Sequence, residues 1–457
     1  FHPLFTKSYV QIRPALQWRG GMLTELWKNG PCFQVSGVRD ITLTEQPAKC
    51  VSSMMRPFLF NAVNKMTSKS QFGSGLHGGS TEFAHLLVRA FFDIAPTMSL
   101  CCATIFCDVA TAFVSMFRMS ILPTFKNDEG WIKILQDHNF SKEEIDDIYS
   151  DAIDLSCWHI DRMNKHVLSM AAKFHEFTWS SSEGLSNVVQ SMRGTLAGTS
   201  CADIIFVASI SKVFAKVFRV LSSHDIHFKL PDLRTNILGV QHESDENQEI
   251  GYADDAALPL LIPAEQVHDV VKFVSEIIVV VFIEHGLLIK FGPTKTAVVI
   301  EWHGAGAVKA KKHLMIDCKG QIEIVPKRGE KQILFVVQVY KHLGTRTAVS
   351  AKMSPEVNYK VALLKQDVKC YRRRVLANEN VPVEKRLTFV PVLLLSKTLF
   401  QCGAWPTLPS GPQRKIHAAI IDVYRIVLDQ KAGVHDHVVT DYDLVQNNPI
   451  VAPLVIL

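Results

Sequence analysis

The chain alternates between short apolar runs that end at polar or glycine positions and longer segments with helical spacing. Residues 103–113, ATIFCDVATAF, begin as an apolar strand that breaks at Asp108. Residues 249–260 predict a strand, a turn and a second strand, because apolar positions flank the polar centre ADD. Apolar positions that recur at helical spacing predict helices over 201–218 and 264–285.

Further elements follow from the same signals. Ser141 followed by Glu144 fits a capping box and predicts that a helix begins there. Residues 286–302 predict a strand, a turn and a strand, and residues 333–344 predict a strand that ends in a glycine turn. From residue 354 onward the pattern is helical and basic. Helices and strands therefore both contribute to the fold, and the part of the chain from residue 354 onward is predicted to be helical.

Composition narrows the class of protein. The 457 residues are 47% hydrophobic and 20% charged, which is typical of two or three core-forming domains. The net charge of +5 is compatible with nucleic-acid binding without demanding it. The sequence contains no CxxC pair of the kind that indicates a zinc site. The apolar run 277–283 is too short to span a bilayer. We see no signal peptide, and both ends look like cuts through a longer reading frame.

Two adjacent carboxylates, Asp254 and Asp255, stand in the middle of the predicted hairpin. Like charges this close repel each other, and burial increases the cost. A bound metal ion is the usual source of compensation. The sequence therefore predicts a metal site at this hairpin.

Several motifs follow one another in a recognisable order: FCDVATAF, RGTLAGTSCADIIF, GYADD, GPTKT and YKHLG. In this order they resemble the reverse transcriptase domain of non-LTR (LINE-type) retrotransposons, over roughly residues 20–430. The YADD tetrapeptide alone is weak evidence, but its place between the other motifs makes it specific. A structural or interaction protein with an accidental YADD remains a distant alternative.

The resemblance implies the catalytic residues of an RNA-directed DNA polymerase. Asp108, Asp254 and Asp255 would hold two Mg²⁺ ions, with Mn²⁺ as a substitute. Carboxylate oxygens suit this hard cation. Lys295 would be the general acid that protonates the departing pyrophosphate.

The resemblance also implies residues that bind substrates. The nucleotide-binding set is Arg39, Lys49, Phe113, Ala197, Gly198 and Tyr252. The two cations would clamp the triphosphate, and the Phe113 ring would exclude a ribose 2′-hydroxyl. The primer-grip set is Tyr340, Leu343 and Gly344.

Three positions depart from the family pattern. Ala197 stands where many relatives carry Gln, Thr199 where Asp is common, and Lys290 near the usual place of an Asn. They keep open the alternative of a catalytically decayed retroelement copy that only binds nucleic acid. Another palm-type polymerase, such as an RNA-directed RNA polymerase, is a further alternative, against which Phe113 argues because ribonucleotide enzymes need room for the 2′-hydroxyl.

The fold that the family implies is α+β, a right-hand polymerase with fingers, a palm with an antiparallel sheet, and a helical thumb. Residues 1–100 would form the N-terminal segment and fingers. Residues 101–349 would form the palm, with a fingers insertion around 120–190, and residues 350–457 the thumb and a truncated C-terminal segment. An RNA template, a DNA primer and dNTPs would be the partners, with no membrane. The nucleus would be the location, with the cytoplasm as a second compartment.

Overall fold

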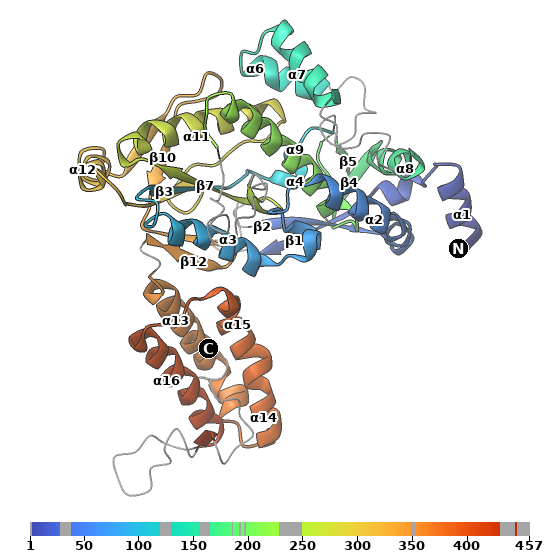
Figure 1. The fold of residues 1–457 in the computed structure, drawn as a ribbon. Helices are drawn as coiled ribbons and strands as arrows, with labels where there is room; N and C mark the ends of the chain where they lie inside the picture. The colour runs from blue at the N-terminus through green and yellow to red at the C-terminus, as the bar shows by residue number, and fades with distance from the viewer. Residues whose placement is uncertain are drawn as a thin grey trace, which may run out of the picture. The chain divides into compact units, whose positions relative to one another are not determined.

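A computed structural model gives the fold (Figure 1) and describes residues 2–27, 38–118, 129–154, 165–184, 186–191, 193–195, 198–227, 249–349, 352–429 and 444–445. Contacts divide the chain into one unit over Phe1–Val337 and a second over Gln338–Leu457. The division falls ahead of the predicted thumb start at residue 350. None of the helices in the described ranges is both long and apolar enough to cross a membrane.

Two sheets organise the first unit. One has the strand order β2-β1-β4-β5, formed by β1 (Gly20–Trp27), β2 (Val38–Thr44), β4 (Thr178–Ser182) and β5 (Val188–Ser191). The other has the order β6-β7-β3-β8-β10-β9, formed by β3 (Cys101–Cys107), β6 (Ile250–Tyr252), β7 (Asp255–Ile262), β8 (Ala297–Glu301), β9 (Gln321–Ile324) and β10 (Gln332–Val336). The protein is therefore α+β, as the sequence predicts.

The six-stranded sheet is mixed, which corrects the prediction of a purely antiparallel palm sheet. Strands β8 and β10 pair in parallel, whereas the other four pairings are antiparallel. Parallel neighbours need a crossover connection, and here β9, which is antiparallel to β10, returns the chain to the end of the sheet where β10 begins. A helical segment joins β8 to β9. It consists of α12 (Ala307–Lys312) and a π-helical turn over His313–Asp317.

Helices cover the six-stranded sheet. Figure 1 shows α11 (Val267–Glu284) above β3 and β7, and α3 (Thr81–Ile94) below them. Strand β3 is buried at every position and needs apolar cover on both faces. Helix α11 packs along α9 (Ala202–Ser222), which in turn contacts α2 (Gln46–Met66).

Shorter helices complete the described part of the first unit. They are α1 (His2–Val10), α4 (Ala112–Ser115), α6 (Glu129–Asp137), α7 (Lys142–Asp154) and α8 (Lys165–His175), with 3₁₀ turns at Leu16–Arg19, Gly73–Gly78 and Ala264–Gln266. The predicted capping box is confirmed: the Glu144 N–H donates to Ser141 Oγ at 3.2 Å, and the Ser141 N–H donates to Glu144 Oε2 at 2.7 Å. The predicted helix over 264–285 is confirmed as a 3₁₀ turn followed by α11.

Two strand predictions need correction. Within 286–302 only β8 is a strand, and the stretch before it makes isolated bridges, such as Val109 with Ile289. These residues run past the end of β3, where they make single bridges and not a continuous ladder. Within 333–344 the chain breaks after β10 and starts a new strand, β11 (Val339–His342), at the boundary of the second unit.

The second unit has its own core. Strand β11 and β12 (Thr345–Ala348) form an antiparallel hairpin. The helices are α13 (Ser354–Tyr371), α14 (Val383–Phe389), α15 (Ser396–Thr398) and α16 (Ser410–Val427), with π-helical turns at Arg372–Leu376 and Val390–Leu395 and a 3₁₀ turn at Cys402–Ala404. Helices α13 and α16 pack against each other through buried residues such as Val361, Leu364 and Ile420. The basic, helical pattern of the sequence is confirmed here.

Candidate active site

Asp108 and Asp255 leave the six-stranded sheet at the same end. Cys107, the last residue of β3, pairs with Ala256 of β7. One residue beyond this pair stand Asp108 on one strand and Asp255 on the other. Strand β3 is buried along its whole length. Asp108 is the first position after β3, so its polar side chain lies just outside the ladder.

The YADD hairpin is a tight turn between β6 and β7. Tyr252 pairs with Asp255, so Ala253 and Asp254 form a two-residue loop. Ala253 has a φ of 59°, which is the kind of positive φ that primed two-residue turns use. The turn therefore presents Asp254 at its tip and Asp255 as the first, exposed residue of β7.

Lys295 lies against Asp108, although the two are far apart in sequence. Its Nζ is 3.2 Å from Asp108 Oδ2, and the two side chains are 49% and 30% exposed. Backbone contacts hold the partners together: the Asp108 N–H donates to Thr296 Oγ1 at 2.9 Å, and the Lys290 N–H donates to the Asp108 carbonyl at 3.0 Å. Thr296 belongs to the motif GPTKT, but the sequence analysis gave it no role.

Phe113 lies on α4, directly after this site, and is partly buried. Its ring stacks on Phe206 of α9, with centroids 4.4 Å apart and an interplanar angle of 28°. The Thr195 N–H donates to the Phe113 carbonyl at 2.7 Å. At Gly194 a Cβ would lie 2.3 Å from that same carbonyl oxygen, so only glycine fits. The Phe113 ring thus packs on Phe206, and the backbone carbonyl of Phe113 is held by Thr195.

Gly198 links the third motif to the other sheet. Its φ is 105°, and a Cβ there would lie 2.4 Å from the carbonyl oxygen of Thr42 on β2. Strand β2 also carries Arg39, whose backbone pairs with Leu26; its side chain lies outside the described part of the structure. Lys49 lies on α2 and is partly exposed.

Other predicted site residues lie in the second unit or outside the described residues. Ala197 lies outside the described residues. The predicted primer-grip residues belong to the second unit: Tyr340 is buried in β11, and Leu343 and Gly344 form the turn to β12 with φ values of 48° and 88°. Gln401 Nε2 donates to the Leu343 carbonyl at 2.9 Å and anchors this turn.

A segment that the motif argument missed braces the YADD hairpin. The Gly251 N–H donates to the Ser70 carbonyl at 3.0 Å, and the Phe72 N–H donates to the Gly251 carbonyl at 2.8 Å. A Cβ on Gly73 would lie 2.4 Å from the Ala253 nitrogen. The glycines of GSGLHGGS could have indicated this contact between the segment and the hairpin, because glycine permits close backbone contact.

A buried acid lies just before the hairpin. Glu249 is fully buried, and Ser68 Oγ donates to its Oε1 at 3.3 Å. Burial raises the pKa of the Glu249 carboxyl to about 8. The carboxyl is therefore mostly protonated at neutral pH, directly before the strand that ends at Tyr252.

The fit of this site to divalent metal ions rests on its donors. Asp108, Asp254 and Asp255 supply only carboxylate oxygens, the ligands that Mg²⁺ prefers. A cationic group, the Lys295 ammonium, already lies at the Asp108 carboxylate. Across the described ranges, no three His, Cys, Asp or Glu residues are grouped closely enough to hold a metal ion by themselves, and this includes the predicted set Asp108, Asp254 and Asp255. Mg²⁺ commonly takes only one or two protein carboxylates and completes its shell with phosphates and water, so the donors fit a metal that arrives with a nucleotide.

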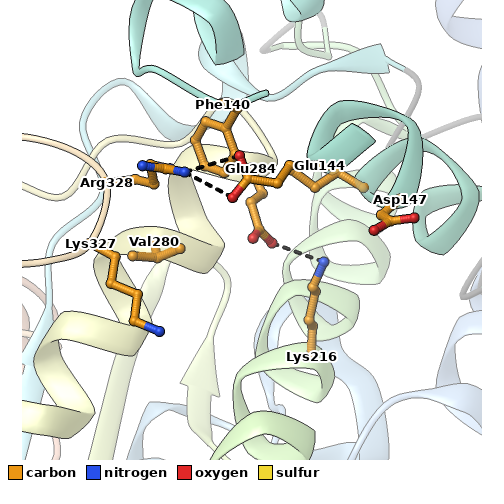
Figure 2. A pocket seen from close by; sticks show the side chains of 9 residues that line it. Phe140, Glu144, Asp147, Lys216, Val280, Glu284, Lys327 and Arg328 are labelled. Atoms are coloured by element: carbon orange, nitrogen blue, oxygen red, sulfur yellow. Dashed lines mark hydrogen bonds and ion pairs between the residues drawn. The ribbon is translucent and has the colours of Figure 1, made fainter. Parts of the chain in front are cut away.

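A separate cavity of about 480 Å³ lies between α7, α9, α11 and the segment 326–331 (Figure 2). Arg328 Nη2 contacts both carboxylate oxygens of Glu144 at 2.8 and 3.0 Å, and its guanidinium lies over the Phe140 ring. Lys216 and Glu284 form a second pair at 2.9 Å, with side chains only 10% and 11% exposed. These pairs fasten α7 to the 326–331 segment and α9 to α11.

No protein-family model matches the chain, and no curated protein matches its sequence. Among solved structures the chain is similar to telomerase from Candida albicans, solved in complex with a fragment of telomeric RNA, at 12% identity and a TM-score of 0.38. The match covers 93% of this chain and 62% of the telomerase chain, less than two thirds of its length. We therefore infer the function from the residues of this chain.

Proposed function

We propose that the chain is an RNA-directed DNA polymerase of a retrotransposon, which adds dNTPs to a primer 3′-hydroxyl. One observation carries the proposal: residues of three separate motifs meet at one end of β3. They are Asp108, the Asp254–Asp255 hairpin and Lys295, whose Nζ lies 3.2 Å from Asp108. A carboxylate pair on a hairpin beside a third carboxylate and a lysine suits phosphoryl transfer.

Each residue has a proposed role. Asp108, Asp254 and Asp255 would hold two Mg²⁺ ions. When bound, the ions would acidify the primer hydroxyl and neutralise phosphate charge. Lys295 Nζ would donate a proton to the leaving pyrophosphate, and Asp108 keeps that ammonium at the site until a nucleotide enters.

Selection of the sugar would fall to Phe113. Its stacking on Phe206 would restrain the ring, and the hydrogen bond to its carbonyl holds the backbone that carries the ring. A restrained ring against the sugar edge would reject a 2′-hydroxyl and favour dNTPs. The exposed arginines at 372–374 would contact phosphates of the template and primer. Reverse transcription of a mobile element onto chromosomal DNA would take place in the nucleus.

The test is primer extension on an RNA template with dNTPs and Mg²⁺. We expect extension by the wild-type chain, and its loss in Asp254→Ala and after chelation with EDTA. Asp146→Ala is the matched control, because Asp146 is an exposed aspartate on α7 away from the hairpin. A folded wild-type chain that binds template without extending a primer would favour the decayed copy instead. Extension that survives Asp254→Ala, once a contaminating polymerase is excluded, would refute the site.

A further inference from the structure

Three side chains beyond the proposed active site line up in the order thiol, imidazole and carboxylate. They are Cys318, His313 and Asp317, on and directly after the π-helical turn that follows α12. Cys318 Sγ lies 3.6 Å from His313 Nε2, and His313 Nδ1 lies 3.2 Å from Asp317 Oδ2. The π-helical turn brings positions four and five residues apart around one imidazole.

The carboxylate fixes which imidazole nitrogen carries the proton. An ionised carboxylate only accepts hydrogen bonds, so Nδ1 of His313 must be the donor toward Asp317. In a neutral imidazole Nε2 is then the acceptor, and it faces the thiol of Cys318. This is the relation of nucleophile, base and orienting group that activates a cysteine.

The charged residues around this group favour an anionic reagent. Lys309, Lys311 and Lys312 precede the imidazole, Lys319 follows the thiol, and all four are exposed. A group of cations attracts anions. His313 and Asp317 have side chains 58% and 60% exposed, so a small molecule can reach the group.

Other cysteines of the chain provide a contrast. Burial raises the pKa of the Cys102, Cys107 and Cys201 thiols to about 12, which makes these thiols poor nucleophiles. Cys50 and Cys370 are exposed, and neither has a hydrogen bond to a histidine within the described ranges. Cys318 therefore differs from both groups, because it is partly exposed and its thiol also faces a base.

We propose that Cys318 is a modification site that reacts with an anionic small-molecule disulfide to form a mixed disulfide. His313 Nε2 takes the proton from Sγ, and the thiolate attacks one sulfur of the reagent. The new bond joins Sγ to that sulfur, the disulfide bond of the reagent breaks, and the departing thiolate takes the proton from the imidazolium. Asp317 positions the imidazole. The inference is independent of the polymerase proposal, since it uses none of its residues.

The experiment exposes the full chain to oxidised glutathione at pH 7.4 and follows each cysteine by peptide mass spectrometry. We expect Cys318 to react about 10²-fold faster than Cys50 and Cys370, the lower end of what a positioned base provides. Cystamine, a cationic disulfide, should lose most of this preference for Cys318. Dithiothreitol should restore the free thiol.

Two variants separate activation from mere exposure. His313→Gln removes the base and should bring the Cys318 rate down to that of the two exposed controls. Asp317→Asn should give an intermediate rate, because the base remains without its orienting carboxylate. Cys102 and Cys107 report unfolding, since they react only if the core opens. A wild-type rate for Cys318 equal to that of Cys50 and Cys370, or an unchanged rate in a folded His313→Gln or Asp317→Asn chain, would overturn the proposal.

Discussion

Replacing Glu249 with Gln should stabilise the protein at neutral pH and remove a pH dependence. The carboxyl has a pKa of about 8 in the folded protein against an ordinary value of 4.5, because burial penalises its charged form. The folded state thus binds this proton more tightly than the unfolded chain does. The resulting loss of stability begins as the pH rises through 4.5 and is complete above about 8.

The magnitude follows from the pKa difference. Each pH unit within this window lowers the free energy of unfolding by about 1.4 kcal/mol. At pH 7 the ionisation of Glu249 in the unfolded chain therefore lowers the free energy of unfolding by roughly 3 kcal/mol. Gln cannot ionise, and its amide oxygen can still accept the hydrogen bond from Ser68.

Urea unfolding at several pH values between 4.5 and 8.5 measures this effect. The stability of Glu249→Gln relative to wild type should be near zero at pH 4.5 and should rise to its maximum near pH 8. Glu265→Gln is the control, because Glu265 is an exposed glutamate whose substitution should give a small, flat difference. A difference for Glu249→Gln that is the same at every pH would refute the reasoning, since burial of an ionisable acid would then not be its cause.

Three further substitutions test other parts of the structure. Gly73→Ala places a Cβ 2.4 Å from the Ala253 nitrogen, so the hairpin must move by about 1 Å. The rate of primer extension should then fall by about 10²-fold. An unchanged rate would mean that the contact between Gly73 and Ala253 does not position the hairpin for catalysis. Lys216→Met leaves Glu284 buried without this ion pair and should lower the free energy of unfolding by about 3 kcal/mol in urea, whereas adding Glu284→Leu should recover most of it. Phe113→Val should increase ribonucleotide incorporation relative to dNTPs in the same extension assay, and equal discrimination by variant and wild type would exclude the ring as the filter.

The sequence predicted elements best where one local signal decides them. The capping box at Ser141 and Glu144 and the hairpin around Asp254 need only neighbouring residues, and both are present. The parallel pairing of β8 with β10 was missed, because it depends on where a crossover returns and not on alternation within either strand.

The candidate site shows the same difference between features set by local signals and features set by the fold. Motif order led to Asp108 and Lys295, which are in contact, though no local pattern requires that contact. Thr296 and Glu249 were missed because their importance comes from what folds around them: one meets the Asp108 amide, and the other becomes buried. The roles of the catalytic residues remain predictions until the extension assay is done.

The bracing of β6 by the segment 70–72 also affects association between molecules. Strand β6 is only three residues long and stands at the edge of its sheet. An unpaired edge offers amides and carbonyls to any extended chain nearby, which is a common start of aggregation. Here the two backbone groups of Gly251 are already bonded to Ser70 and Phe72. The hairpin can therefore present its carboxylates to solvent without also presenting a free strand edge to another protein.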